Sequence, residues 1–450
     1  MTAEIAIMNK EAVALAADSA VTTGTVEGKI FNSANKLFPL GRDHSVGMMI
    51  YQDAELMGVP LETIIKIYRD RALGKKPLKT LKSYANNFIR FLNNANNSFN
   101  DLFSESEQGK YFDLVVSYYF ESTRDRIIDL ASKQKTTNKR VARKKIRAIT
   151  ENTMQAVLNS YTNRLKSDKK YQAIANNYLP VVERRYKKII REAGKRIFKE
   201  LPISHTLQKT VDRIAIASFA TNYLDPQEFF DGTGNYSGVV IAGFGEDDRF
   251  PSLESYKVGG LVGDRLIYSK DRYYYRDNVI GSENKGGVNK GRIFTFAQEE
   301  LIQTFLTGIG PSYEKKLVAY FKQKASALCK SIIDTVGNIS DDEKGRLQKR
   351  IQGQINKEKE AYRTYIWDLG FDRRIPIEAV IVPALPKDEL ALMAETLVSL
   401  ASFERRVSPG RETVGGPIDV AVISKVDGFI WVKKKSYFTP EINPDYYEGR

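Results

Sequence analysis

Two short apolar segments at the start of the chain constrain its fold more than any other feature. Residues Ile5–Met8 and Ala12–Ala17 are apolar, and the turn-forming sequence Asn9-Lys10-Glu11 separates them. Apolar segments of this length, bounded by turn residues, are typical of buried β-strands. The sequence therefore predicts that the chain begins with two strands joined by a tight turn.

Three polar residues flank these strands and form a candidate catalytic group. Thr2 precedes the first strand, Asp18 directly follows the second, and Lys36 lies beyond a further predicted hairpin. If Met1 is removed, Thr2 carries a hydroxyl and a free α-amino group, which together make a nucleophile with its own base. Asp18 and Lys36 would supply the charges that tune it. Taken singly, each has an ordinary explanation, because Asp is common in turns and Lys is common on surfaces.

The N-terminal stretch resembles the β-subunits of the proteasome and their bacterial relatives, which are N-terminal-nucleophile (Ntn) hydrolases with a catalytic Thr. The resemblance rests on Thr2, on Ala16-Ala17-Asp18-Ser19 followed by Thr22-Thr23-Gly24, and on Asn35-Lys36-Leu37-Phe38. Asp18 keeps the family's spacing of sixteen residues from the Thr, whereas Lys36 lies two residues further along than usual. Two later strings, VVIAGFGEDD and VGGPIDVAVISKVDGFIW, resemble strand pairs of the same family.

The resemblance implies an α+β fold, the four-layer αββα sandwich of Ntn hydrolases, interrupted by two helical insertions. We expect the first part of the core in residues 1–74, a basic helical insertion in 75–211, and the second part of the core in 212–311. A second helical insertion is expected in 312–376, and the C-terminal helix, hairpin and tail of the core in 377–450.

Individual elements follow from apolar periodicity and turn residues. The expected strands and helices are a strand at Ser45–Tyr51, a helix opening at Asp53-Ala54-Glu55, a strand at Ser237–Phe244, a helix at Phe294–Leu306, a helix at Leu385–Ala401, and a terminal hairpin of Pro417–Ser424 and Gly428–Val432.

The resemblance also implies an oxyanion hole, which in the family is a backbone N–H of the Gly in an Ala-Gly pair. Met48-Met49 occupies that position here, so Met49 is the expected donor, and Gly47 is the alternative if the register slips by two. Thr22 is a further candidate for backbone contacts with substrate.

The supporting residues of the family's site match less well. Glu412 lies near the position of the family's acid, and Val414 stands where the family has a Ser before Gly-Gly. Ser282 is a weak candidate for the other supporting Ser. The resemblance therefore supports catalytic roles for Thr2, Asp18 and Lys36 more strongly than it supports roles for the residues around them.

The expected function is that of a proteasome-like threonine peptidase, which hydrolyses peptide bonds through Thr2 and self-associates. An Ntn amidohydrolase acting on a small amide is an alternative, because both enzymes use the same chemistry and the substrate pocket determines which substrate is bound. A third possibility is a non-catalytic scaffold or nucleic-acid-binding protein that uses the Ntn fold and binds an anionic partner through the basic insertion, although a scaffold has no need to keep Thr2, Asp18 and Lys36 together.

The chain is strongly basic, with 69 Lys and Arg against 55 Asp and Glu and a net charge of +14. Part of the excess lies between residues 133 and 147, where there is no acid and a basic run is either a solvated face or a site for an anionic partner. This run consists of Lys133, Lys135, Lys139, Arg140, Arg143, Lys144, Lys145 and Arg147.

Other residue types exclude several classes of protein. The single cysteine, Cys329, excludes an internal disulfide framework, and two histidines, His44 and His205, exclude a His-rich metal site. No cofactor or metal is expected. No stretch of eighteen apolar residues suggests a membrane span, and the N-terminus lacks the pattern of a secretory signal, so we expect a cytoplasmic protein.

Overall fold

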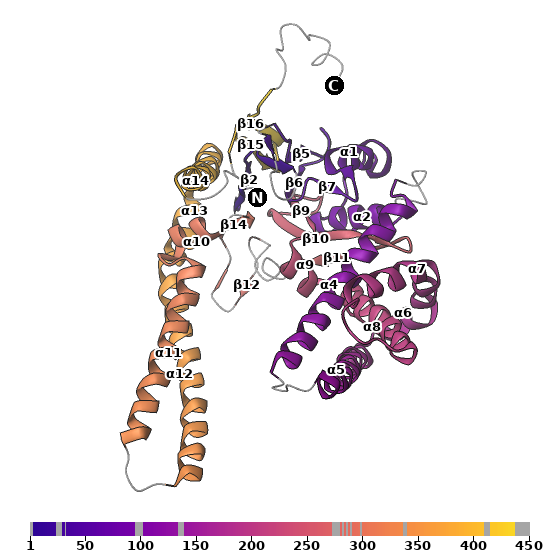
Figure 1. The fold of residues 1–450 in the computed structure, drawn as a ribbon. Helices are drawn as coiled ribbons and strands as arrows, with labels where there is room; N and C mark the ends of the chain where they lie inside the picture. The colour runs from indigo at the N-terminus through magenta and orange to yellow at the C-terminus, as the bar shows by residue number, and fades with distance from the viewer. Residues whose placement is uncertain are drawn as a thin grey trace. The chain divides into compact units, whose positions relative to one another are not determined.

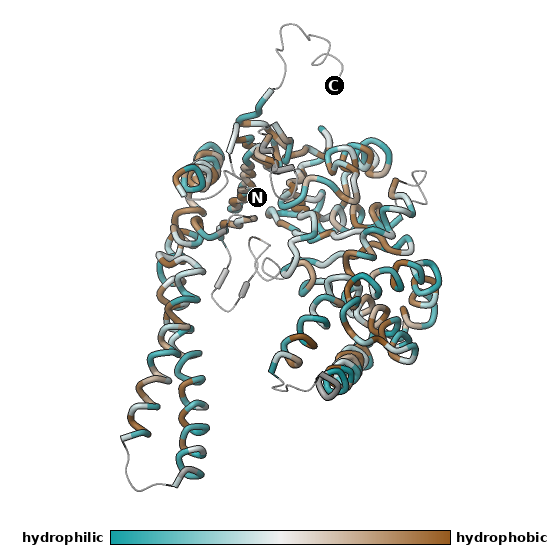
Figure 2. Tube along the Cα trace, viewed as in Figure 1, coloured by the Kyte–Doolittle hydropathy of each residue, from teal (hydrophilic) through white to brown (hydrophobic). Residues whose placement is uncertain are grey.

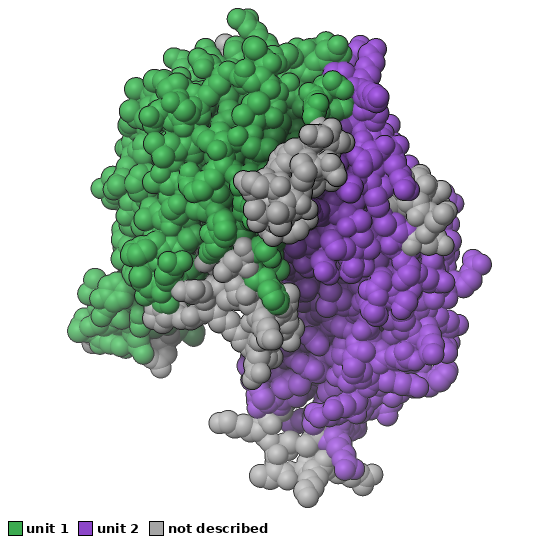
Figure 3. Space-filling model, turned by 90° about the horizontal axis from the view of Figure 1, so that it is seen from above, with its two compact units in different colours: residues 1–51, 242–253, 277–450 green, residues 52–241, 254–276 purple. Residues whose placement is uncertain are grey.

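The structure is a computed structural model that describes residues 3–23, 29–31, 33–94, 102–133, 139–271, 280, 283–284, 287–288, 290–297, 299–335, 340–408 and 415–436. It combines helices with antiparallel sheets, which confirms the expected α+β class. The chain forms two compact units (Figure 3). Unit 1 contains residues 1–51, 242–253 and 277–450, and unit 2 contains residues 52–241 and 254–276.

Unit 1 is built on a five-stranded antiparallel sheet (Figure 1). Its order is β14-β1-β2-β15-β16, so the predicted N-terminal and C-terminal hairpins are both confirmed and pair directly through β2 and β15. The side chain of Asn9 shapes the first turn, because its Oδ1 accepts the N–H groups of Glu11 and Ala12. The strands are β1 (Ala3–Asn9), β2 (Ala12–Ala17), β14 (Gly291–Ala297), β15 (Asp419–Ser424) and β16 (Gly428–Lys433).

Helices cover one face of this sheet. Ile5 and Ile7 of β1 lie in one apolar cluster with Leu390 and Val398 of α14, and all four side chains are buried. Successive side chains of a strand point to opposite faces, so Glu4 points away from this helical layer. The helices that contribute to the layer are α10 (Glu299–Thr307), α13 (Val382–Ala384) and α14 (Lys387–Val407).

The hairpin of β5 (Leu37–Pro39) and β6 (Val46–Gln52) packs on the other face of the sheet. A Cβ at Gly47 would lie 2.8 Å from side-chain atoms of both Ile423 and Phe429, so glycine permits the close approach. The ring centroid of Tyr51 lies 5.2 Å from that of Phe296 in β14. Unit 1 therefore contains a layer of helices, the five-stranded sheet and the β5–β6 pair, in that order.

A second five-stranded sheet has the order β11-β10-β9-β6-β5. Its other strands are β9 (Ser237–Gly243), β10 (Ser252–Val262) and β11 (Arg265–Lys270). The turn between β10 and β11 consists of Gly263 and Asp264, with φ angles of 53° and 62°. Two successive residues with positive φ are characteristic of the type I′ turn, which suits the twist of a hairpin.

Unit 2 is mainly helical, as predicted for residues 75–211, but its helices continue beyond that boundary to Thr233. The reason is that α8 supplies Ile214 and Phe219 to the same apolar core as Phe112 and Phe120 of α4. The helices are α1 (Leu61–Ile67), the π-helix η1 (Tyr68–Leu73), α2 (Leu81–Asn93), α4 (Glu105–Ser132), α5 (Lys139–Ser167), α6 (Tyr171–Asn177), α7 (Leu179–Ile197), α8 (His205–Leu224) and α9 (Gln227–Thr233).

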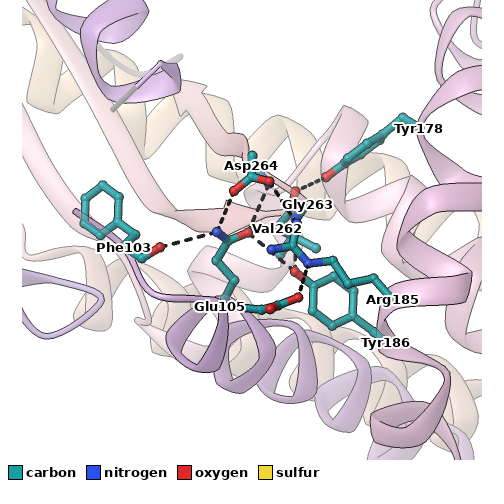
Figure 4. Close-up of polar contacts among 9 residues, drawn as sticks. Phe103, Glu105, Tyr178, Arg185, Tyr186, Val262, Gly263 and Asp264 are labelled. Atoms are coloured by element: carbon teal, nitrogen blue, oxygen red, sulfur yellow. Dashed lines mark hydrogen bonds and ion pairs between the residues drawn. The ribbon is translucent and has the colours of Figure 1, made fainter. Parts of the chain in front are cut away.

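A polar cluster fixes the β10–β11 turn to these helices (Figure 4). Gln108 of α4 donates to Asp264 Oδ1 at 2.8 Å and accepts the Asp264 N–H at 3.0 Å. Arg185 of α7 bonds Asp264 Oδ2 at 2.8 Å and Glu105 at 2.7 Å, and Tyr186 Oη accepts the Gly263 N–H. These hydrogen bonds join both turn residues to α4 and α7, so the cluster holds the β10–β11 hairpin against these two helices.

Two expected elements differ from the structure. The predicted helix at Asp53 begins only at Leu61, after a short hairpin of β7 (Glu55–Leu56) and β8 (Val59–Pro60). Met57 and Gly58 form its turn with φ angles of 52° and 79°, which a helix does not accommodate. The first part of the helix predicted at 294–306 is instead strand β14, because it pairs with the free edge of β1.

The second predicted insertion is a pair of long helices, α11 (Pro311–Thr335) and α12 (Asp341–Pro376), along which polar and apolar residues alternate (Figure 2). Helix α12 begins with a capping box, since Ser340 and Glu343 exchange side-chain-to-backbone hydrogen bonds. At the other end of α12, the buried Glu378 lies 2.8 Å from both Arg292 and Arg374, which ties the pair to β14. Glu378 belongs to the π-helix η2 (Ile377–Ile381).

Three short hairpins complete the described structure. Besides β7–β8, these pair β3 (Val21–Thr23) with β4 (Lys29–Phe31) and β12 (Glu283–Asn284) with β13 (Gly287–Val288). None of the described helices is long and apolar enough to cross a membrane.

Candidate active site

A buried ion pair joins two of the residues singled out from the sequence. Lys36 Nζ lies 2.5 Å from Asp18 Oδ1, and their side chains are 3% and 0% exposed. Asp18 follows β2 and Lys36 precedes β5, and the two residues are adjacent in space because the β5–β6 pair packs on the sheet that contains β2. The N–H of Ile50 in β6 donates to the carbonyl of Lys36 at 3.0 Å and fixes its backbone.

The Asp18 carboxylate collects donors from three further segments of the chain. Its Oδ1 accepts the Ala3 N–H at 3.1 Å, and its Oδ2 accepts the N–H groups of Ala20 at 3.3 Å and Gly415 at 2.9 Å. With Lys36, four donors contact the two carboxylate oxygens, each of which can accept two hydrogen bonds. Asp18 therefore anchors the Lys36 ammonium at the start of β1.

Gly415 was not predicted to touch this group, although its Gly-Gly pair contributes to the family resemblance. Gly415 donates its N–H to Asp18 Oδ2, and its carbonyl accepts the Ser19 N–H at 3.2 Å. Ser19 Oγ also donates to the carbonyl of Pro417 at 2.5 Å. These bonds align the segment before β15 with the end of β2, as their strand pairing requires.

Glu4 is the second residue that sequence reasoning missed. Its Oε1 lies 3.2 Å from Lys36 Nζ, and its side chain is fully buried. The sequence gave one signal for it, because Glu4 directly precedes an apolar strand and a charge that is buried there needs a partner. The described part of the site is thus one Lys shared by two carboxylates.

The expected oxyanion donors lie within a strand. Met49 and Gly47 belong to β6, opposite Leu37 and Pro39 of β5, and both are buried. In the strand order β6 has neighbours on both sides. These backbone groups therefore belong to a hydrogen-bonded strand and not to its end. Thr22 pairs with Ile30 in the hairpin of β3 and β4.

Three of the expected residues, Thr2, Ser282 and Glu412, lie outside the described residues, as does Val414. Ala3, which follows Thr2 in the chain, is the first described residue and is bonded to Asp18. Within the described ranges, no group of three or more His, Cys, Asp or Glu side chains could hold a metal ion.

The basic run is described in part. Arg143, Lys144 and Lys145 are exposed on α5. Two other cations of the run have acidic partners one helical turn away: Lys133 pairs with Asp129, and Arg147 pairs with Glu151. Lys135 and the side chains of Lys139 and Arg140 lie outside the described structure. On α7, Arg185 and Arg196 also form ion pairs, so that helix adds less free positive charge than its composition suggests.

In comparisons with known proteins, no family model and no curated protein matches this chain. The functional assignment therefore rests on the residues of the chain itself.

Proposed function

We propose that this chain is an Ntn hydrolase of the proteasome type, a threonine peptidase whose nucleophile is Thr2 after removal of Met1. The observation that carries the proposal is the buried Asp18–Lys36 pair, bonded to Ala3 at the start of β1. Asp18 and Lys36 are the two charged groups that the family uses, and Asp18 is hydrogen-bonded to Ala3, the residue next to Thr2. Such a pair is unfavourable to bury unless it is needed, because both charges lose their hydration.

The layers of unit 1 also support the proposal. Helix α14, the β14-β1-β2-β15-β16 sheet and the β5–β6 pair correspond to three successive layers of an αββα sandwich. In the proposed fold, the β5–β6 pair is part of the second β layer, and a second helical layer completes the sandwich. The α11–α12 pair and the helices of unit 2 are then insertions into this core.

The proposed chemistry begins with the Thr2 hydroxyl, a poor nucleophile that must lose its proton. The α-amino group of the same residue accepts it, since its pKa in a peptide is about 7.7–8.0. Thr2 Oγ then attacks the carbonyl carbon of the substrate, the amine leaves with a proton, and an ester on Thr2 remains. Water hydrolyses this ester. The Lys36 ammonium stabilises the developing negative charge, and Asp18 offsets the desolvation of Lys36.

A screen of peptides and small amides tests this proposal and separates its two enzymatic forms. Turnover of unstructured peptides supports the peptidase, whereas turnover of small amides alone supports an Ntn amidohydrolase. Self-association is part of the peptidase proposal, because subunits of this type work in rings, and light scattering at micromolar concentration tests it. If none of these substrates is hydrolysed by protein with a free Thr2 amine, the enzymatic proposal fails.

The first expected result concerns the N-terminus. Met1 should be absent from the natively expressed protein, because methionine aminopeptidases accept a small second residue such as Thr, and the α-amine of Thr2 should be free. An intact-mass measurement decides this. Retained Met1 or an acetylated Thr2 would remove the base from the proposed mechanism.

The exposed cations of α5 favour a second proposal, an anionic partner for the basic insertion. Arg143, Lys144 and Lys145 are exposed on one helix, and among the described residues they form no ion pair with an acid. We expect a labelled DNA duplex or acidic peptide to bind at 50 mM salt and to lose most of its affinity at about 200 mM, as counterion release requires. Neutralising these three residues should abolish binding. Unchanged binding, or none at low salt, would mean that the face is only solvated.

A further inference from the structure

Helices α11 and α12 lie side by side and expose most of their large apolar side chains (Figure 1). A short connection joins them, so they run antiparallel, and the rings of Phe321 and Tyr362 stack between them with centroids 4.8 Å apart. Of the described apolar side chains of these two helices, only Ile333, Ile355 and Ile366 are buried. Helices in proteins gain most of their stability from packing of an apolar face, so this pair needs further packing.

The exposed apolar side chains form two stripes on one side of the pair. Tyr320 directly precedes Phe321, and Tyr365 directly precedes the buried Ile366, so both stripes lie one position before residues that face the other helix. In antiparallel helices such positions fall on the same side of the pair, and steps of three or four residues keep each stripe on one helix face. The α11 stripe is Tyr313, Leu317, Tyr320, Leu328 and Ile332, and the α12 stripe is Tyr365 and Leu369, each 40–65% exposed.

The two stripes offer enough surface for a stable contact. Aromatic side chains bury about 150–250 Å² each, and about half of each stripe residue is exposed, so together the stripes present on the order of 700 Å². One partner contributes about 800 Å² to a standard protein interface. Monomeric proteins rarely expose a larger apolar patch than a few hundred Å² unless it binds something. We therefore expect this face to be covered.

The charges beside the two stripes have opposite signs. On α11, the ammonium groups of Lys316 and Lys324 lie over the rings of two stripe tyrosines, 5.4 Å and 5.3 Å from the ring centroids. On α12, Glu358 and Asp372 lie seven residues before and after Tyr365, which places them on the face of the α12 stripe, and both are exposed. Among the described residues, none of these four charged groups forms an ion pair. A partner that fits must therefore offer both signs of charge.

We propose that this face binds the same face of a second copy of the chain, with α11 of each copy beside α12 of the other. In a two-fold dimer each contact occurs twice, so the basic α11 stripe meets the acidic α12 stripe at both places. The four helices form a bundle whose core includes the stripes. An anionic membrane fits less well, because the acids of α12 would repel it. The dimer requires neither the proposed catalysis nor a ring, so its test is independent of theirs.

Reversal of the charges tests this arrangement in the full-length protein. An acidic variant carries Lys316→Glu and Lys324→Glu, and a basic variant carries Glu358→Lys and Asp372→Lys, so that both stripes of a variant have the same sign. Sedimentation velocity should show a dimer dissociation constant at least about tenfold higher in each variant alone than in the wild type, because like charges then face each other. An equimolar mixture, with one variant tagged, should form mixed dimers, since acidic stripes then meet basic ones.

The matched control is the double variant Lys315→Glu and Lys322→Glu, which makes the same charge change on α11. Both lysines are exposed, and each lies two positions after a stripe residue, about 200° around the helix. This control should dimerise like the wild type, and circular dichroism should show the wild-type helix content in all three variants. Three results would each overturn the inference: a wild type that is monomeric at micromolar concentration, acidic and basic variants that each dimerise like the wild type, or a mixture without mixed dimers.

Vesicles of phosphatidylglycerol and phosphatidylcholine test the other occupant of this face. The wild type should not bind them through the stripes, so the acidic variant and the wild type should float equally with the vesicles. Flotation of the wild type that is lost in the acidic variant would assign the face to a lipid surface and overturn the dimer.

Discussion

Replacing Thr2 by Ala is expected to abolish hydrolysis while leaving the fold intact. The variant loses the nucleophilic oxygen but keeps the α-amine, and the residues of the Asp18–Lys36 pair and of the Asp18–Ala3 hydrogen bond are unchanged. Loss of the nucleophile in hydrolases of this kind lowers kcat by several orders of magnitude, so turnover should fall at least about 1000-fold. Steady-state kinetics with a substrate from the screen measures the effect.

Thr2→Ser is the matched control, because Ser retains both the hydroxyl and the α-amine. It should keep measurable activity, and both variants should unfold at the wild-type denaturant concentration. Wild-type turnover in Thr2→Ala would place the chemistry elsewhere in the chain.

Removing the shared cation should have the largest effect on stability. Lys36→Met leaves the carboxylates of Asp18 and Glu4 buried without the ammonium that both contact. Breaking a buried pair by deleting one partner costs about 3–5 kcal/mol. The free energy of unfolding should fall by about this amount, and hydrolysis should fall by orders of magnitude because the proposed site loses its positive charge.

Two comparisons isolate the cause of this loss. Adding Glu4→Gln to Lys36→Met should recover part of the stability, because one of the two carboxylates that lost the ammonium is then replaced by a neutral amide. Lys133→Met removes a cation from the Lys133–Asp129 pair, whose side chains are 65% and 61% exposed, and should change stability by less than about 1 kcal/mol. Equal losses in Lys36→Met and Lys133→Met would show that burial of the first pair has no energetic consequence.

The sequence predicted those parts of the structure that depend on local pattern. The apolar runs around Asn9 gave β1 and β2, and the Val-Asp-Gly turn gave the hairpin of β15 and β16. The proximity of Asp18 and Lys36 could also be predicted, because each lies at the end of a recognisable strand and the order and spacing resemble a known family. The catalytic role of these residues remains a prediction.

The remaining differences between the prediction and the structure arise where tertiary contacts determine the local structure. The segment 291–297 was assigned in part to a helix because apolar residues continue from it into α10, yet the edge of β1 makes it a strand. The sequence marks Glu4 as a charged residue beside an apolar strand, but it does not show that the partner is Lys36, because that contact depends on how the β5–β6 pair packs on the sheet that contains β1. The contact of Gly415 with Asp18 likewise depends on the pairing of β2 with β15.

The most direct test of the account is to trap the acyl-enzyme. The protein, with its N-terminal mass already known, is incubated with an electrophilic peptide that reacts with hydroxyl nucleophiles, digested, and analysed by tandem mass spectrometry. One adduct is expected, on Thr2, and it should form much more slowly in Lys36→Met and be absent from Thr2→Ala. An adduct at another residue, or equal labelling of Thr2→Ala, would contradict it.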